Sequence, residues 1–304
     1  MVVNSQNFIT HGTIDSTCKK RKKTMTSCTV ATCDAKNGSP KAIAVADRMV
    51  TFGDLSVAYE HDTSKIWELS ENSVALTAGD ALEYVDLCRQ VMDQIPPRAR
   101  LPILDVTEKV KDEYLKLRMK KVEEEYFALK GFSIAWFYQN QSILNETLIL
   151  RLDKLIEDYS FNLYLLIAGV DERGAHIYYV HPPNQIGMMG AYSCYDSMGY
   201  CTMGTGQGHS DMVFVANKYT PSLPLKDALF ICYEAKKRAE VAVGVGKDFT
   251  DVSIIDKNGV TPLKDTVEEL EKIYQQSLNM EKSRKSEIQK SIDQLEIKEL
   301  EDRS

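Results

Sequence analysis

Short apolar runs separated by polar turns dominate the first part of the chain after residue 25. Residues 26–33 are mostly small or β-branched, and the polar loop 34–40 separates them from a second apolar run at residues 42–46. Apolar runs bounded by Asn, Gly, Ser and Pro are typical of β-strands. Two such strands joined by a short loop form an antiparallel hairpin, which brings Asp47 back beside the start of the first strand.

Later parts of the chain show blocks of strand-like runs and blocks with helical spacing. We expect further strands at residues 65–69, 74–78, 163–170 and 177–180, and a last strand at 252–255. We expect helices from residue 81 to Pro96-Pro97, over 103–129, over 148–159, from about 211, over 225–241 and in the tail after 264. Residues 132–137 fit either a strand or a buried turn of helix. Blocks of strands and helices, without strict alternation, predict an α+β fold with antiparallel sheets and outer helices.

Composition narrows the class of protein. The 304 residues are 43% hydrophobic, which is enough for a sizeable core. No run of about 18 apolar residues is present, so we expect no membrane partner. The net charge of −7 does not favour a nucleic-acid-binding surface.

The cysteine pattern indicates the redox state of the compartment and whether a metal site is expected. Seven cysteines are scattered along the chain without a CxxC pair, and the N-terminus lacks the apolar core of a secretory signal. Unpaired cysteines are the rule in a reducing compartment. We therefore expect a cytoplasmic protein that needs neither a metal nor an organic cofactor.

The chain divides into three parts. Residues 1–25 are polar and include a basic cluster at 19–23, and we interpret them as a disordered leader or propeptide. Residues 26–263 form the expected globular domain. Residues 264–304 form a charged helical C-terminal extension with a thin apolar stripe, which is compatible with pairing to another helix and with a solvated appendage.

Thr26 begins the first strand and carries the candidate chemistry. A threonine hydroxyl is a poor nucleophile without a base, and a free α-amino group titrates near neutrality, at about 7.7–8.0. If Thr26 were the first residue of the mature chain, its own amine could take the hydroxyl proton. This requires that methionine removal acts on a chain started at Met25, or that residues 1–25 leave as a propeptide.

Four short motifs, in this order, resemble the proteasome β-subunit superfamily of Ntn hydrolases. They are Ala46-Asp47-Arg48, Ser64-Lys65-Ile66, Thr77-Ala78-Gly79-Asp80-Ala81 and Ala168-Gly169-Val170-Asp171. Met25-Thr26-Ser27-Cys28 and the Asp-Arg-Met-Val-Thr element at 47–51 are similar to bacterial and archaeal proteasome-type proteins. The resemblance covers about residues 26–259 and implies a four-layer αββα sandwich of Ntn-hydrolase type.

The resemblance also implies roles for single residues. Thr26 matches the nucleophile, Asp47 the aspartate near it, and Lys65 the lysine that lowers the proton affinity of the nucleophile. Gly79 matches the glycine whose backbone N–H faces the developing oxyanion, and a residue without a side chain suits such a close approach. Each of these residues also has a plain structural interpretation: a strand threonine, a turn cap, a surface lysine and a helix start.

Two points of the resemblance stay open. Aligning Val30-Ala31 with the Val-Gly of core-particle subunits makes Ser27 the first residue and a rival nucleophile, although the Met-Thr-x-Cys match favours Thr26. Core-particle subunits carry a serine near the nucleophile where this chain has Val243. The Gly-Thr-Gly segment at 204–206 partly resembles the family's Gly-Ser-Gly, so Thr205 is a candidate for the missing hydroxyl.

The expected function is that of a proteasome-like N-terminal-threonine hydrolase, a threonine-type endopeptidase or amidohydrolase acting through an acyl-enzyme. The family implies peptide or protein substrates and self-assembly into a homo-oligomer, and leaves open a partner that unfolds substrates. Two alternatives remain: a small-amide hydrolase or acyl/peptidyl transferase using the same site, and a non-catalytic structural subunit. The long helical segment near 103–160 could cover the substrate cleft or remake subunit contacts.

Overall fold

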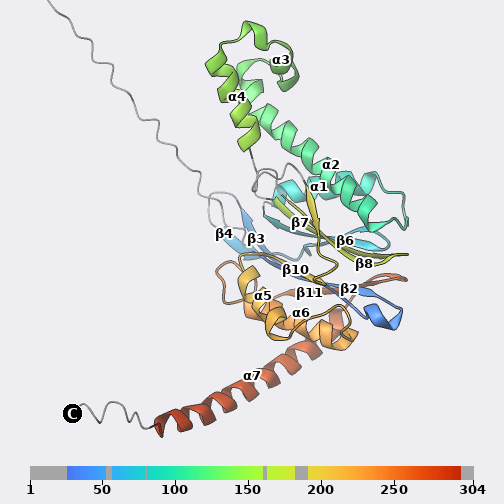
Figure 1. The fold of residues 1–304 in the computed structure, drawn as a ribbon, viewed down its shortest axis with the longest axis vertical. Coiled ribbons are helices and arrows are strands. Elements are labelled where there is room, and N and C mark those ends of the chain that lie inside the picture. The colour runs from blue at the N-terminus through green and yellow to red at the C-terminus, as the bar shows by residue number, and fades with distance from the viewer. Residues whose placement is uncertain (1–25, 53–56, 80, 160–162, 182–190, 296–304) are drawn as a thin grey trace, which may run out of the picture.

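The computed structural model describes residues 26–52, 57–79, 81–159, 163–181 and 191–295. The expected leader at 1–25 lies outside these residues. Within the described part of the chain, two five-stranded sheets and a two-stranded ribbon combine with helices, and all strand pairs are antiparallel (Figure 1). The α+β class with antiparallel sheets is therefore confirmed.

The first sheet contains the predicted hairpin. Its strands in spatial order are β10 (Tyr200–Gly204), β1 (Ser27–Cys33), β2 (Lys41–Asp47), β11 (Thr250–Asp256) and β12 (Gly259–Pro262). Cys28 pairs with Ala46 across β1 and β2, so Asp47 at the end of β2 lies next to the start of β1.

The second sheet is built around two neighbouring hairpins. Its order is β5 (Ile66–Ser70), β6 (Ser73–Gly79), β7 (Leu163–Asp171), β8 (Gly174–Val180) and β9 (Tyr192–Cys194). Gly79 pairs with Leu163 at one end of β6 and β7, and Ser73 pairs with Gly169 near the other. The ribbon of β3 (Met49–Phe52) and β4 (Val57–Glu60) follows β2 along the chain.

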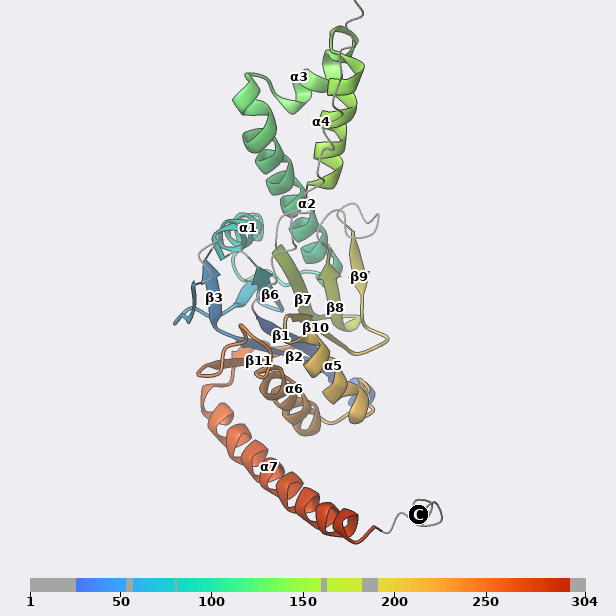
Figure 2. The ribbon, with the colours of Figure 1, turned by 90° about the vertical axis from the view of Figure 1, so that its left-hand side faces the viewer.

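Alternating side chains in the strands create three apolar layers. In β1, Val30 belongs to the cluster between the two sheets, whereas Ala31 belongs to the cluster under the outer helices, because successive strand residues point to opposite faces. Helices α1 (Ala81–Asp93) and α2 (Ile103–Val122) pack on the second sheet. Helices α5 (Gln207–Ala216) and α6 (Leu225–Ala239) pack on the first sheet (Figures 1 and 2).

Two helical segments project from this body. Beyond α2 the chain continues through a π turn and a 3₁₀ turn to Gly131, then forms α3 (Ile134–Gln139) and α4 (Glu146–Asp158), which share a small apolar cluster of their own. Helix α7 (Lys264–Asp293) leaves the first sheet on the other side, and its buried residues, Leu270 and Tyr274, both lie in its first half (Figure 2). None of the helices described here is long and apolar enough to cross a bilayer.

Several local expectations needed correction. Residues 132–137 lead into the short helix α3, in which Ile134 and Phe137 are buried, so the buried turn of helix is confirmed and the strand alternative is wrong. Residues 252–255 do lie in a strand, β11, but the expectation that this strand is the last is wrong, because β12 follows it after a tight turn and pairs with it. Helix α5 begins at Gln207, before the expected start near Asp211. Strands β3, β4 and β9 are short and were not predicted at all.

Candidate active site

Three of the predicted site residues meet in one buried cluster. Thr26 Oγ1 donates a hydrogen bond to Asp47 Oδ1 over 3.1 Å, and Lys65 Nζ lies 2.6 Å from the same oxygen. Lys65 Nζ also donates to Thr26 Oγ1. The exposed fractions of Thr26, Asp47 and Lys65 are 1%, 0% and 3%. A hydroxyl, a carboxylate and an ammonium group therefore share a site shielded from water.

The strand arrangement explains why these residues converge. The β1–β2 hairpin returns Asp47 to the start of β1, where Thr26 precedes Ser27. Lys65 comes directly before β5 in the second sheet, where its carbonyl accepts the N–H of Thr77 from β6 over 3.3 Å. Because the two sheets face each other, a lysine from one reaches the strand start of the other.

The electrostatics of the cluster favour an activated hydroxyl. A cation within hydrogen-bond distance stabilises the deprotonated form of its partner. A buried ion pair is tolerated when its remaining lone pairs are satisfied. Here the backbone N–H of Gly246 donates to Asp47 Oδ2 over 2.7 Å. Asp47 is thus held from two sides, by Lys65 and by Gly246.

Glycines let the end of β10 lie against the backbone of Thr26. Gly204 has a φ of +101°, and a Cβ at this position would lie 2.1 Å from the Thr26 carbonyl oxygen. The N–H of Gly206 reaches that same oxygen over 3.4 Å. Any side chain at residue 204 would displace Thr26, so the Gly-Thr-Gly segment positions the candidate nucleophile through its backbone.

The remaining two predicted residues stay outside the cluster. Thr205 Oγ1 donates to the carbonyl of Val243 over 3.4 Å, so its hydroxyl links two loops instead of contacting Thr26. Gly79 ends β6 with a φ of +119°, a conformation that favours glycine. Among the described residues, Gly79 and Thr26 are not joined by a hydrogen bond.

Ser27 and Cys28 are placed less favourably than Thr26. The hydroxyl of Ser27 is buried and has no hydrogen-bond partner among the described residues. The thiol of Cys28 lies 3.6 Å from the Thr77 carbonyl, and burial raises the pKa of this thiol far above its usual range, although Lys65 opposes the shift. Of these three neighbours, only Thr26 has both a cation and a carboxylate at its reactive atom.

Lys236 is a buried charge that sequence reasoning missed. It lies in α6 with no exposed surface, and its ammonium is 2.7 Å from Glu240 Oε1. Burial lowers the pKa of Lys236, and the carboxylates of Glu240 and Asp47 partly oppose this shift. In the sequence Lys236 stands in a Lys-Lys-Arg run at a helix end, where basic residues are ordinary. No local signal sets it apart.

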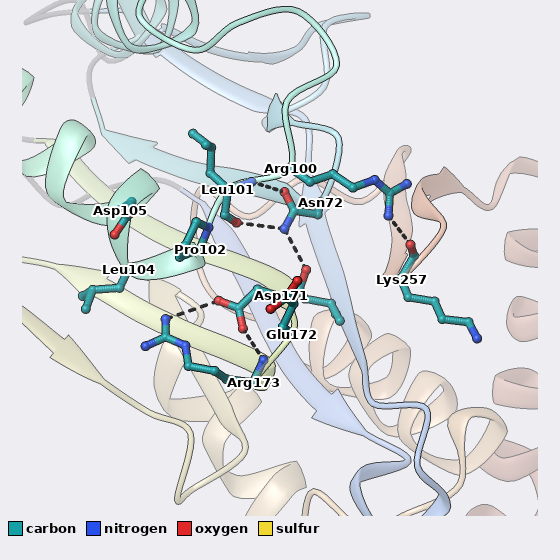
Figure 3. A pocket seen from close by; sticks show the side chains of 11 residues that line it. Asn72, Arg100, Leu101, Pro102, Leu104, Asp105, Asp171, Glu172, Arg173 and Lys257 are labelled. Atoms are coloured by element: carbon teal, nitrogen blue, oxygen red, sulfur yellow. Dashed lines mark hydrogen bonds and ion pairs between the residues drawn. The ribbon is translucent and has the colours of Figure 1, made fainter.

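A cavity of about 700 Å³ lies at the opposite end of the sheets, where β7 turns into β8 (Figure 3). Its polar groups bond mainly to one another: the Asn72 side chain donates to the carbonyls of Leu101 and Val170, and Arg100 donates to the Lys257 carbonyl. These contacts tie loops together. The cavity is therefore separate from the Thr26 cluster.

Comparisons with known proteins add nothing to this geometry: a search against models of protein families and a search of curated proteins both returned no match. The described residues also contain no group of three or more His, Cys, Asp or Glu side chains arranged to hold a metal ion.

Proposed function

We propose that this chain is a proteasome-like N-terminal-threonine hydrolase that cleaves peptide or amide bonds through an acyl-enzyme. The observation that carries the proposal is the contact of the Thr26 hydroxyl with both the Lys65 ammonium and the Asp47 carboxylate. Activated nucleophiles need a partner that lowers their proton affinity and a third group that orients that partner. Lys65 and Asp47 provide these two functions.

The layer order supports the same proposal. Two facing sheets carry α1 and α2 on one outer surface and α5 and α6 on the other. The proposed four-layer αββα sandwich of Ntn-hydrolase type would have this order of layers, with Thr26 directly before β1.

The reaction would proceed in two steps. Thr26 Oγ attacks the substrate carbonyl carbon, and its proton passes to the Thr26 α-amine, which then donates it to the departing amine. The acyl group remains on Thr26 Oγ as an ester, which water cleaves with the same amine as base. Gly79 N–H is the proposed donor to the oxyanion in both steps.

This mechanism requires a free amine at Thr26. In the 304-residue chain the nitrogen of Thr26 belongs to a peptide bond with Met25. Cleavage of this bond, or a translation start at Met25 with methionine removal, would create the amine that the mechanism uses. A cytoplasmic setting, expected from the cysteine pattern, and assembly of several copies, expected from the resemblance, remain part of the proposal.

A non-catalytic structural role is the second candidate. The specific observation that favours it is the 1% exposure of Thr26 together with the hydroxyl of Thr205 bonded elsewhere. A subunit of this kind would keep its peptide bond at Thr26 and would never react with an electrophile.

Intact mass and N-terminal sequencing of the purified protein test the proposal. We expect a chain that begins at Thr26 and gains the mass of one acyl group from an electrophilic probe. Changing Thr26 to Ala should abolish this gain, whereas Ser27→Ala, the matched control, should retain it. Labelling that survives Thr26→Ala but is lost in Ser27→Ala would move the nucleophile to Ser27. A native chain that keeps Met25 and resists the probe would support the structural role.

A further inference from the structure

Glu60 at the end of β4 binds the backbone of a distant segment. Its carboxylate accepts hydrogen bonds from three successive N–H groups: those of Lys247, of Asp248 over 2.9 Å, and of Phe249 over 2.8 Å. Convergent backbone N–H groups of this kind form a concave anion site, and a carboxylate that fills it is bound strongly. Glu60 therefore fixes residues 247–249.

The residue before this segment contacts the candidate site directly. Gly246 donates its N–H to Asp47 Oδ2. A Cβ added to Gly246 would lie 2.6 Å from Glu60 Oε1 and 3.3 Å from Asp47 Cβ. Gly246 is thus enclosed between the Glu60 and Asp47 side chains. Glu60 therefore packs against the segment whose Gly246 N–H donates to Asp47.

We propose that Glu60 is a positioning residue of the Thr26 site: it holds residues 246–249 so that the Gly246 N–H faces Asp47. This inference rests on the proposed function, because it assigns Glu60 an influence on the reactivity of Thr26 through Asp47 and Lys65. Within the described part of the chain, Glu60 makes no hydrogen bond or ion pair to the side chain of Thr26, Asp47 or Lys65.

Arg48 fixes a neighbouring part of the same segment, which shows which part depends on Glu60. Arg48 binds Asp251 with two guanidinium nitrogens, and its guanidinium lies 5.2 Å from the ring centre of Phe249. This anchor holds the segment near Phe249 and beyond it. Gly246 lies on the other side, after Gly244 with its φ of +86°, where the backbone is least restricted. Together with the bond from Gly246 to Asp47, Glu60 restrains this glycine-rich side.

Hydrogen exchange measures the anchoring without any assumption about activity. We expect the amides of residues 246–249 to exchange at least about tenfold faster in Glu60→Gln than in the native sequence, because the amide side chain lacks the charge that three N–H groups share. Glu68→Gln, which alters an exposed glutamate of the neighbouring sheet, is the matched control and should leave these rates unchanged. Unchanged exchange in Glu60→Gln would overturn the inference.

The rate at which Thr26 is acylated measures how the loss of the Glu60 charge affects the candidate site. In chains that begin at Thr26, we expect Glu60→Gln to react with the electrophilic probe about 10- to 100-fold more slowly, as small displacements of a reacting group do. Glu60→Asp, which keeps the charge, should recover part of the rate.

The outcomes separate this inference from the proposed function. Faster exchange with an unchanged acylation rate would overturn the positioning role while leaving the hydrolase intact. A native chain that starts at Thr26 but never acylates would overturn the proposed function, whatever Glu60 does. Gly246→Ala serves as a second variant: its new methyl group meets the Glu60 carboxylate, so it should slow acylation as Glu60→Gln does, and a native rate would count against the inference.

Discussion

Two carboxylate–cation clusters lie at opposite ends of the second sheet. At one end Lys65 joins Asp47 and the Thr26 hydroxyl. At the other end the His176 ring lies between two carboxylates, with Nδ1 2.6 Å from Asp196 and Nε2 3.1 Å from Asp171. Both clusters are largely shielded from water and both pair opposite charges.

The partners of the carboxylates distinguish the two clusters. Asp171 accepts the N–H of Ile103 at the start of α2 and the N–H of Arg173 in the turn, and Asp196 accepts the N–H of Ile177. The His176 cluster therefore links backbone segments to one another, which is a structural role. The Thr26 cluster instead surrounds a side-chain hydroxyl. A buried ion pair is a candidate for catalysis when it contacts a group that can react, such as the Thr26 hydroxyl. The presence of buried charge does not by itself distinguish a catalytic cluster from a structural one.

The largest effect should follow from Lys65→Met. Acylation of Thr26 should fall at least about 10³-fold, because the hydroxyl loses the cation that favours its reactive form. Urea unfolding should show a loss of about 3–5 kcal/mol, the cost of leaving a buried carboxylate unpaired. The double variant Lys65→Met with Asp47→Asn should regain stability but not acylation. A single variant that acylates at the native rate would remove Lys65 from the mechanism.

Asp171→Ala should lower the stability of the fold without changing the reactivity of Thr26. Two backbone N–H groups and His176 lose their acceptor, so the free energy of unfolding should fall by about 2–3 kcal/mol. The acylation rate per folded molecule should stay unchanged, since the cluster lies at the far end of the sheet. Glu172→Ala, at an exposed neighbouring position, should change stability by less than about 0.5 kcal/mol. A loss of acylation in Asp171→Ala would show that the two clusters are coupled.

His176 should give the far cluster a pH dependence of its own. The hydrogen bond to Asp196, together with the charges of Asp196 and Asp171, raises the pKa of His176 above its usual 6.5, while burial opposes this shift. The protonated ring is therefore favoured by folding. Its stabilisation is complete below pH 6.5 and is lost as the pH rises through the raised pKa.

The matching measurement compares the native sequence with His176→Gln by urea unfolding at several pH values. The stability advantage of the native chain should shrink by up to roughly 1 kcal/mol from about pH 6 to about pH 9. An advantage that stays constant, or grows, over this range would contradict the assignment.

Thr205→Val should have the smallest effect. The Thr205 hydroxyl contacts the Val243 carbonyl at the long distance of 3.4 Å and not the candidate nucleophile. We expect the acylation rate to stay within about twofold of the native rate. A larger loss would restore the role that the sequence assigned to this hydroxyl.

Local patterns were sufficient to predict much of the fold, whereas the resemblance to the proteasome β-subunit superfamily singled out Thr26, Asp47 and Lys65 as candidate site residues. The β1–β2 hairpin follows from apolar runs around a polar loop, and it accounts for the approach of Asp47 to Thr26. Lys65 was assigned from the motif in which it stands. The contact between Gly246 and Asp47 spans 199 positions and those of Glu60 span 187 to 189. Backbone donors at such separations leave no periodicity in the sequence, so this part could not be predicted.

The contacts of Thr26 have a consequence for the timing of its exposure. Asp47, Lys65 and Gly206, which bond to Thr26, all follow it in the chain, as does Gly204, which lies against it. Among the described residues, the contacts that position Thr26 therefore come from segments that follow it in the chain. Cleavage of the peptide bond before Thr26 after folding would leave all of these contacts in place.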